Sequence, residues 1–137
     1  MKHPQVLVVE RNGRLAQLLR VPCQERGWAL REPRQVEHCL ELLRADCPAA
    51  LVVRLGGKLE QELGLLERVH WQQPRVRLVA VGEVENPLLA ELAWDLGASY
   101  VHFPPLPMEL LTATVLRLLE CAISEFHHRL DVGDGES

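Results

Sequence analysis

The chain alternates short runs of aliphatic, often β-branched residues with longer amphipathic stretches, and it does so five times. The short runs cover residues 5–10, 28–32, 49–55, 75–82 and 99–103. Several are apolar along their whole length, which is typical of parallel strands covered on both faces. The amphipathic stretches cover residues 13–25, 33–45, 60–71, 87–96 and 108–126. This alternation predicts a parallel sheet with helices on both faces.

The length of the chain limits how these units are arranged. Five strand–helix units within 137 residues leave room for one domain. They favour a three-layer α/β sandwich with five helices and a five-stranded parallel sheet in the order 2-1-3-4-5. We expect the domain to cover residues 1–126, and we expect the polar residues 127–137 to form a disordered tail.

Local signals indicate where the helices begin and end. Asn12 is predicted to cap the first helix, and Gly27 to end it. Pro22 lies inside that helix and predicts a kink or an early break near Val21. The pair Asn86-Pro87 is a cap followed by a proline at the first helical position, which predicts the start of the fourth helix.

Composition argues against several classes of protein. The net charge is −4 and the pI about 5.9, which disfavours a nucleic-acid binder. No apolar run approaches the roughly 18 residues that cross a bilayer, and the first ten residues do not form a signal peptide. We therefore expect a cytoplasmic protein. The cysteines have no metal or disulfide spacing, and we expect free, mostly buried thiols at Cys23, Cys39, Cys47 and Cys121.

The predicted sheet also predicts where function should lie. In a doubly wound sheet the ligand crevice lies outside the carboxyl ends of the strands. The residues that follow the first, third, fourth and fifth strands are therefore the candidates. They are Glu10, Arg11, Arg54, Gly82, Glu83, Phe103 and Pro104.

Four segments at these positions resemble the receiver domain of bacterial response regulators in two-component signalling. They are VLVVERNGRLAQLL, PAALVVRL, LVAVGEVENPLLAELAWDLGAS and YVHFPPLPMELL. Their order and spacing agree with the family over roughly residues 4–122. The resemblance implies a flavodoxin-like, CheY-like fold and a place in a phosphorelay.

The reactive positions of the family are altered in this sequence. The resemblance implies two acids that hold Mg²⁺, and Glu10 and Arg11 stand there. The phospho-acceptor aspartate would fall at Arg54, the switch Ser or Thr at Gly82, and the partner Lys at Phe103. A guanidinium cannot form an acyl phosphate, and it repels a divalent cation. The sequence therefore resembles a degenerate pseudo-receiver that cannot be phosphorylated in the usual way.

Two local features of the crevice follow from these positions. We expect Glu10 to pair with Arg54 across neighbouring strand ends, because a lone charge in a partly desolvated crevice is costly. Arg11 is a competing cation for Glu10. Pro104 is retained, and the resemblance implies a cis peptide bond before it.

We expect the chain to act by contact with another signalling protein, without enzymatic activity, cofactor or metal. No nucleophile can be placed beside a base in the crevice, and Glu83 is at most a lone general base whose side chain is expected to be solvated. The resemblance implies an interface on the fourth helix, fifth strand and fifth helix, and the apolar last helix suggests a homodimer. The predicted interface residues are Trp94, Tyr100, His102, Leu119, Ala122 and Phe126.

The alternative is a sensor of a small phosphate-containing ligand or nucleotide. Arginine forks bind phosphate well, and glycine amides can cradle an anion. The residues that would form this site are Arg11, Arg54, Gly56, Gly57 and Lys58. No recognised nucleotide-binding motif supports it, and Glu10 opposes an anion.

Overall fold

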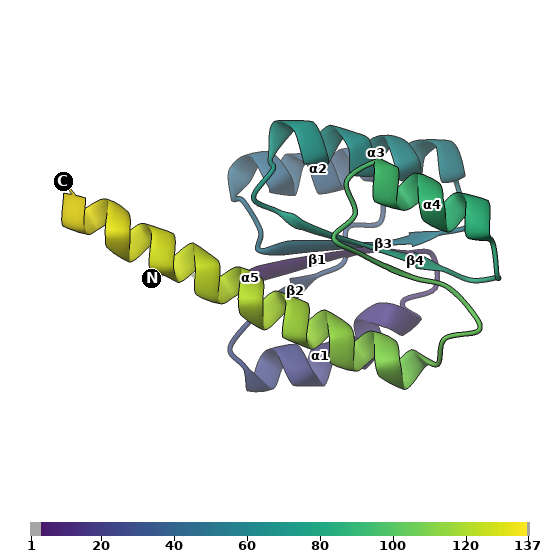
Figure 1. Ribbon diagram of the computed structural model, residues 1–137, viewed down its shortest axis with the longest axis horizontal. Coiled ribbons are helices and arrows are strands. Elements are labelled where there is room, and N and C mark those ends of the chain that lie inside the picture. Colours follow the sequence, from purple (N-terminus) through teal and green to yellow (C-terminus); the bar gives the residue numbers. More distant parts are fainter. Residues whose placement is uncertain (1–3, 137) are drawn as a thin grey trace.

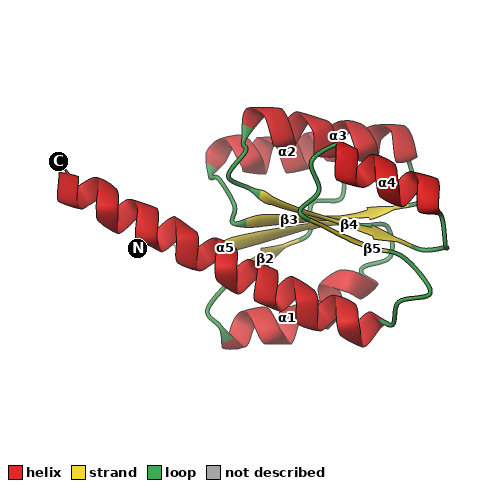
Figure 2. Cartoon of the chain, viewed as in Figure 1, coloured by secondary structure: helices red, strands yellow, loops and turns green. Residues whose placement is uncertain are grey.

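The sheet has the predicted topology. The computed structural model describes the backbone of residues 4–136 and the side chains of residues 4–121, 123 and 124. Its strands are β1 (Gln5–Val9), β2 (Ala29–Arg31), β3 (Ala50–Leu55), β4 (Arg77–Gly82) and β5 (Tyr100–His102). All neighbouring strands are parallel, and their order is β2-β1-β3-β4-β5 (Figure 2). The predicted doubly wound α/β sandwich is therefore confirmed.

Helices cover both faces of this sheet. They are α1 (Arg14–Glu25), α2 (Val36–Ala45), α3 (Leu59–Gln72), α4 (Pro87–Asp95) and α5 (Met108–Glu136). Helices α2, α3 and α4 lie on one face, and α1 and α5 lie on the other (Figure 1). The carboxyl ends of the strands consequently meet at one edge, between the two helical layers.

Alternate residues of the central strands enter two separate cores. Leu7 and Val9 of β1 belong to the core under α2, α3 and α4. Val6 and Val8, which alternate with them along the strand, belong to the core under α1 and α5. Strand side chains point to opposite faces in turn, so a strand buried on both faces must be apolar at every position. This is the physical reason for the continuous apolar runs in the sequence.

The start of α1 differs from the prediction. Gly13, with a φ of 74°, is the residue before the helix, and Asn12 Oδ1 accepts one hydrogen bond, from Arg14 N at 3.1 Å. Asn12 is therefore not the cap. The predicted cap at Asn86 is confirmed, since its Oδ1 accepts from Leu89 N at 3.1 Å.

Of the kink or early break predicted near Val21, the break is wrong, because α1 runs continuously from Arg14 to Glu25. Proline removes the bond to the carbonyl of Leu18, one turn earlier. Leu18 and Val21 are exposed, so that stretch of the helix faces solvent, which can satisfy the carbonyl. Packing of the buried side of α1 then outweighs the loss of one hydrogen bond.

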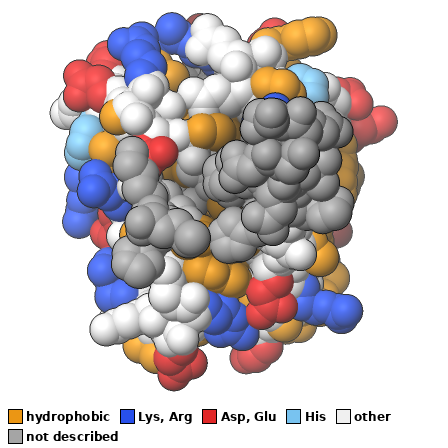
Figure 3. Space-filling view, turned by 90° about the vertical axis from the view of Figure 1, so that its left-hand side faces the viewer, with side chains coloured by type: hydrophobic (Ala, Val, Ile, Leu, Met, Phe, Trp, Pro, Cys, Tyr) orange, Lys and Arg blue, Asp and Glu red, His pale blue; other side chains and the backbone are white. Residues whose placement is uncertain are grey.

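The last helix is longer than expected. We placed its end near residue 126, but α5 continues to Glu136, through the segment expected to be a disordered tail. Each residue added to an existing helix gains a backbone hydrogen bond without a new nucleation step. Its C-terminal half leaves the body of the domain (Figure 1), and charged side chains of both signs lie toward the outline of the domain face seen from that end (Figure 3). Within the described residues no helix has the length and apolarity to cross a membrane.

Candidate functional site

The crevice at the carboxyl edge brings together most of the residues expected there. Glu10 follows β1, Arg54 is the penultimate residue of β3, and Gly82 ends β4. In the parallel register, Arg54 pairs with Val81 and Leu55 with Gly82. The side chain at position 83 therefore lies one step beyond the end of β3, within reach of Arg54.

Glu10 serves as the cap of α1. Its Oε1 accepts from Leu15 N at 2.9 Å and its Oε2 from Ala16 N at 2.7 Å. Only 3% of its side chain is exposed. A carboxylate at this place satisfies amides that the first turn of a helix leaves unpaired, and it lies at the positive end of the helix dipole.

Arg54 lies between two carboxylates. Its Nη1 is 3.9 Å from Glu10 Oε1, which confirms the predicted pair. Its Nε is nearer to Glu83 Oε1, at 3.1 Å. Only 16% of the Arg54 side chain is exposed, whereas 45% of the Glu83 side chain is. The Nε–H is not aimed at that oxygen as a hydrogen bond requires, so the contact with Glu83 is mainly one of charge.

Glu83 is the residue that sequence reasoning missed in this role, because we expected its side chain to be solvated. The sequence did contain a signal for this contact. Glu83 directly follows β4 and Arg54 lies near the end of the neighbouring strand β3, so their opposite charges are expected to meet. Gly56 helps to hold Glu83 in place. A Cβ on Gly56, whose φ is +148°, would lie 3.4 Å from Glu83 Cδ, so the carboxylate packs against the bare backbone of the loop.

Arg11 does not compete for Glu10. Its aliphatic stem lies across the loop between β3 and α3, where a Cβ on Gly57 would be 2.4 Å from Arg11 Cδ. Any side chain at position 57 would have to displace Arg11. The two arginines of the crevice are thus directed differently: Arg54 lies between Glu10 and Glu83, and Arg11 extends over the loop.

Phe103 closes the crevice on the side of β5. It is 8% exposed and belongs to the core under α2, α3 and α4. Its ring lies directly over Gly82, so that a Cβ there would be 2.1 Å from the ring. The cis peptide bond in this region joins Pro104 and Pro105. The resemblance had implied that the bond before Pro104 would be cis, and that implication is wrong by one residue.

A divalent cation does not fit the residues of this crevice. Both carboxylate oxygens of Glu10 accept amide hydrogens, and the Arg54 guanidinium lies where such a cation would need further oxygen ligands. Within the described residues, no group of three or more His, Cys, Asp or Glu side chains could hold a metal ion.

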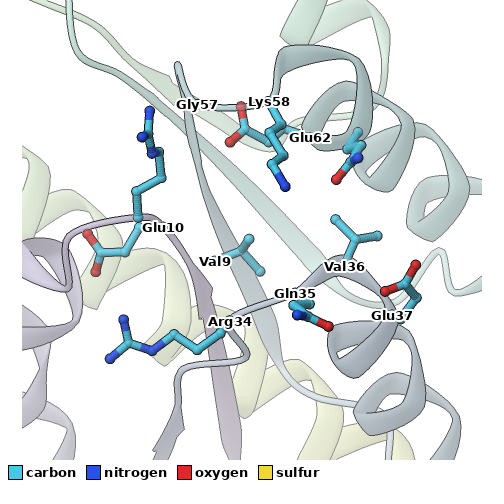
Figure 4. A pocket seen from close by; sticks show the side chains of 11 residues that line it. Val9, Glu10, Arg34, Gln35, Val36, Glu37, Gly57, Lys58 and Glu62 are labelled. Atoms are coloured by element: carbon cyan, nitrogen blue, oxygen red, sulfur yellow. The ribbon is translucent and has the colours of Figure 1, made fainter.

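A pocket of about 600 Å³ adjoins the crevice under the first turns of α2 and α3 (Figure 4). Its lining residues are Val9, Glu10, Arg11, Arg34, Gln35, Val36, Glu37, Gly57, Lys58, Gln61 and Glu62. Three of the five residues expected to bind an anion are among them, and Arg54 and Gly56 are not. Arg34 was missed, although the loop before α2 opens at the same edge of the sheet.

The predicted interface residues divide between surface and core. Trp94 is 49% exposed and Tyr100 is half-buried. His102 is 1% exposed and Leu119 is fully buried against the sheet, so neither contributes to an interface. The side chains of β5 and α5 that face the domain interior belong to the core, because this face of the sheet is covered by α5. The side chains of Ala122 and Phe126 lie outside the described residues.

The strand order and the crevice at the carboxyl edge define a CheY-like fold of the flavodoxin type. No family profile matches the sequence, and no curated protein matches it. Its structural neighbours are response regulator receiver domains, at sequence identities that establish a shared fold alone.

Three of these neighbours span most of the chain. A CheY-like receiver domain protein from Methanospirillum hungatei has a TM-score of 0.73 and 14% identity, covering 90% of this chain and 99% of that one. A putative response regulator from Chloroflexus aurantiacus has a TM-score of 0.72 and 17% identity, with coverage of 87% and 99%. A response regulator from Burkholderia pseudomallei, described with a phosphorylated aspartic acid and a calcium ion, has a TM-score of 0.70 and 22% identity, with coverage of 95% and 74%.

Proposed function

We propose that this chain is a receiver-like signalling module that is not phosphorylated on an aspartate and acts by contact with another signalling protein. The observation that carries the proposal is the position of Arg54. Its guanidinium lies 3.9 Å from Glu10 and 3.1 Å from Glu83, at the strand end where the resemblance would put the acceptor aspartate. The Arg54 guanidinium thus supplies positive charge, from within the chain, that offsets part of the charge of these two carboxylates.

The other altered positions support the same conclusion. Gly82 has no hydroxyl and Phe103 has no ammonium, so neither can hold a phosphoryl group. The Phe103 ring also fills the space over Gly82. The crevice is therefore filled by the Phe103 ring, and its charged side chains contact one another, which is typical of a site with a structural role.

We propose further that the module is not an enzyme. Among the described crevice residues the carboxylates of Glu10 and Glu83 face Arg54, and neither lies beside a nucleophile. A general base needs a proton to abstract within hydrogen-bond reach. Glu83, expected at most to be a lone general base, lies against the Arg54 guanidinium at 3.1 Å.

The surface that supports protein contact lies around the N-terminal ends of α4 and α5. Six large apolar side chains are exposed on α4, on the first turn of α5 and on the segments that lead into these two helices. They are Val84, Leu88, Leu92, Leu106, Met108 and Leu110, and we refer to them as the α4–α5 surface. Leu88 is 80% exposed. Because α4 and α5 follow neighbouring strands, their first turns lie at the same edge of the sheet, and exposed apolar side chains at one edge of a domain are candidates for an interaction site.

The phosphorylation part of the proposal is tested by intact-protein mass spectrometry. The chain is incubated with acetyl phosphate and Mg²⁺, beside a phosphorylatable receiver domain as positive control. We expect no phosphoryl adduct on this chain. An acid-labile adduct would overturn the proposal. Tryptophan fluorescence is a poor reporter of the crevice, because all three tryptophans lie toward the opposite edge of the sheet. Trp28 directly precedes β2, and Trp71 and Trp94 lie at the C-terminal ends of α3 and α4.

The contact part is tested with paired variants. Leu88→Asp and Leu110→Asp add charge to the α4–α5 surface, and Val21→Asp does the same at an exposed apolar residue of α1. A signalling protein captured by the wild type and by Val21→Asp, but lost from both other variants, would support the proposal. Capture that survives all three substitutions would refute the assignment of this surface.

A further inference from the structure

We propose that the pocket between α2 and α3 binds a nucleoside phosphate, with the phosphates held by Arg11, Arg34 and Lys58. This inference does not depend on the proposed function, since the pocket shares no residue with the α4–α5 surface. Three basic side chains from three different loops line one hollow. Arg11 follows β1, Arg34 precedes α2, and Lys58 precedes α3.

The basic side chains of the pocket are less engaged than two of its three acids, Glu10 and Glu62. Among the described residues, Arg11 and Lys58 form no ion pair, and Arg34 has one loose contact with Glu32 at 4.0 Å. Glu10, by contrast, is bound by two amides of α1 and lies near Arg54. Positive charge is thus available in the pocket.

The two remaining acids differ in how they bear on an anion. Glu62 is buried, and its Oε1 accepts from Gly56 N at 3.0 Å. It lies in the first turn of α3, where the helix dipole offsets its charge. Glu37 also lies in the first turn of its helix, α2, but it is exposed and accepts no hydrogen bond among the described contacts. It should weaken anion binding, which makes it useful in the test.

The size of the pocket and its apolar side chains indicate a ligand that is larger than inorganic phosphate and partly apolar. A hollow of about 600 Å³ is in the range of sites for cofactor-sized molecules. Val9 and Val36 point into it, and Lys58 reaches in from the opposite wall (Figure 4). A lining that combines apolar and basic side chains suits a molecule with a flat ring and a phosphorylated end. The amides of Gln35 and Gln61 add neutral hydrogen-bonding groups.

Isothermal titration calorimetry on the full chain tests this site. The probes are the four common ribonucleoside diphosphates, each titrated separately, with the matching nucleosides and inorganic pyrophosphate as comparison. We expect at least one diphosphate to bind, more tightly than its nucleoside and than pyrophosphate, and more weakly as salt is raised. No binding by any diphosphate at millimolar concentration would overturn the proposal. Pyrophosphate binding as tight as that of every diphosphate would also overturn it, because the ring would then contribute nothing.

Variants locate the binding. Arg34→Ala and Lys58→Ala should each weaken it about tenfold, the loss expected for one charge-assisted contact. Glu37→Gln should strengthen it. Arg68→Ala, at an exposed residue of α3 outside the pocket, is the matched control and should bind as the wild type does. Equal affinity in the double variant of Arg34 and Lys58 would place binding elsewhere and refute the inference.

Discussion

The ring of Phe103 occupies the space that any side chain on Gly82 would need. A Cβ at Gly82 would lie 2.1 Å from Cδ2 and Cε2 of that ring. Gly82 ends β4 and Phe103 follows β5. These strands are neighbours in the sheet, so the two residues meet although they are 21 positions apart in the sequence. The crevice therefore cannot accept a hydroxyl side chain at position 82 while Phe103 remains.

This packing predicts the effect of Gly82→Ser. The new side chain must displace the ring, and overpacking of this kind costs about 1–3 kcal/mol of unfolding free energy. Phe103→Ala should remove the clash. The double variant should therefore lose less unfolding free energy than the two single variants lose together. Urea denaturation of the four proteins gives this coupling. Gly64→Ser, at an open helical position, is the control and should not destabilise; a similar loss there would contradict the steric explanation.

The two ion pairs of Arg54 should contribute unequally. Arg54→Met leaves the buried Glu10 carboxylate without its cation, and it should cost about 1–3 kcal/mol because Glu10 keeps its two amide bonds. Glu83→Gln removes the more exposed partner and should cost less than about 1 kcal/mol. Thermal or urea unfolding measures both. The reverse order would show that Glu83, and not Glu10, is the important partner of Arg54.

Glu10, and not Asn12, should hold the start of α1. Glu10→Ala removes two hydrogen bonds to partly buried amides, and should cost roughly 2–3 kcal/mol. Asn12→Ala should change stability by less than about 0.5 kcal/mol, as exposed substitutions usually do. Amide hydrogen exchange at Leu15 and Ala16 gives a local readout. Exchange there should accelerate in Glu10→Ala alone; acceleration in Asn12→Ala instead would restore the prediction from the sequence.

His102 should make stability fall at mildly acidic pH. Burial lowers its pKa below the ordinary value of 6.5, and this outweighs an opposing contact with the Leu106 backbone. The unfolded chain therefore binds a proton more readily than the folded chain. Stability contributed by neutral His102 is present above about pH 6.5, and is lost as the pH falls toward the folded pKa.

The measurement is urea denaturation at several pH values between about 5 and 8. His102→Gln should show a weaker pH dependence than the wild type, because the glutamine does not titrate. Tyr100 Oη lies 3.0 Å from His102 Nδ1, and Tyr100→Phe serves as a control that removes this hydrogen bond but keeps the titrating ring. An unchanged pH profile in His102→Gln would exclude His102 as the source.

The four free thiols should react at very different rates. Cys23 and Cys39 are buried, and burial raises the pKa of Cys39 to about 12, whereas Cys47 and Cys121 are exposed. The expectation of mostly buried thiols is thus met by only two of them. A thiol reagent at neutral pH should modify Cys121 and Cys47 in the native chain and all four in denaturant. The double variant Cys47→Ser/Cys121→Ser should be inert when native; fast modification of it would show that the buried sites open readily.

Much of the site followed from the sequence because strand ends are easy to place. Once the five apolar runs were assigned to parallel strands, Glu10, Arg54, Gly82 and Phe103 had to meet at one edge. The charge of Arg54 and the small size of Gly82 are properties of the chain itself. They argue against aspartyl phosphorylation before any coordinates are considered.

Other features depended on neighbours that are distant in the sequence. Glu83 became a partner of Arg54 through the register between β3 and β4. Arg34 joined the pocket through the position of the loop before α2. His102 and Leu119 were expected on a surface, but the core beneath α1 and α5 needs them, and the pattern of the last helix does not show which side the sheet covers.

The alternation of apolar runs and amphipathic stretches was sufficient to determine the architecture. Hydrophobic burial depends on the spacing of apolar residues along the chain, and much less on which apolar residue stands at each position. The pairing of Glu10, Arg54 and Glu83, the packing of Phe103 on Gly82 and the pocket beside them were decided only when the strands came together. Such contacts depend on atoms within a few ångströms of one another, and a linear pattern carries no distances of that kind.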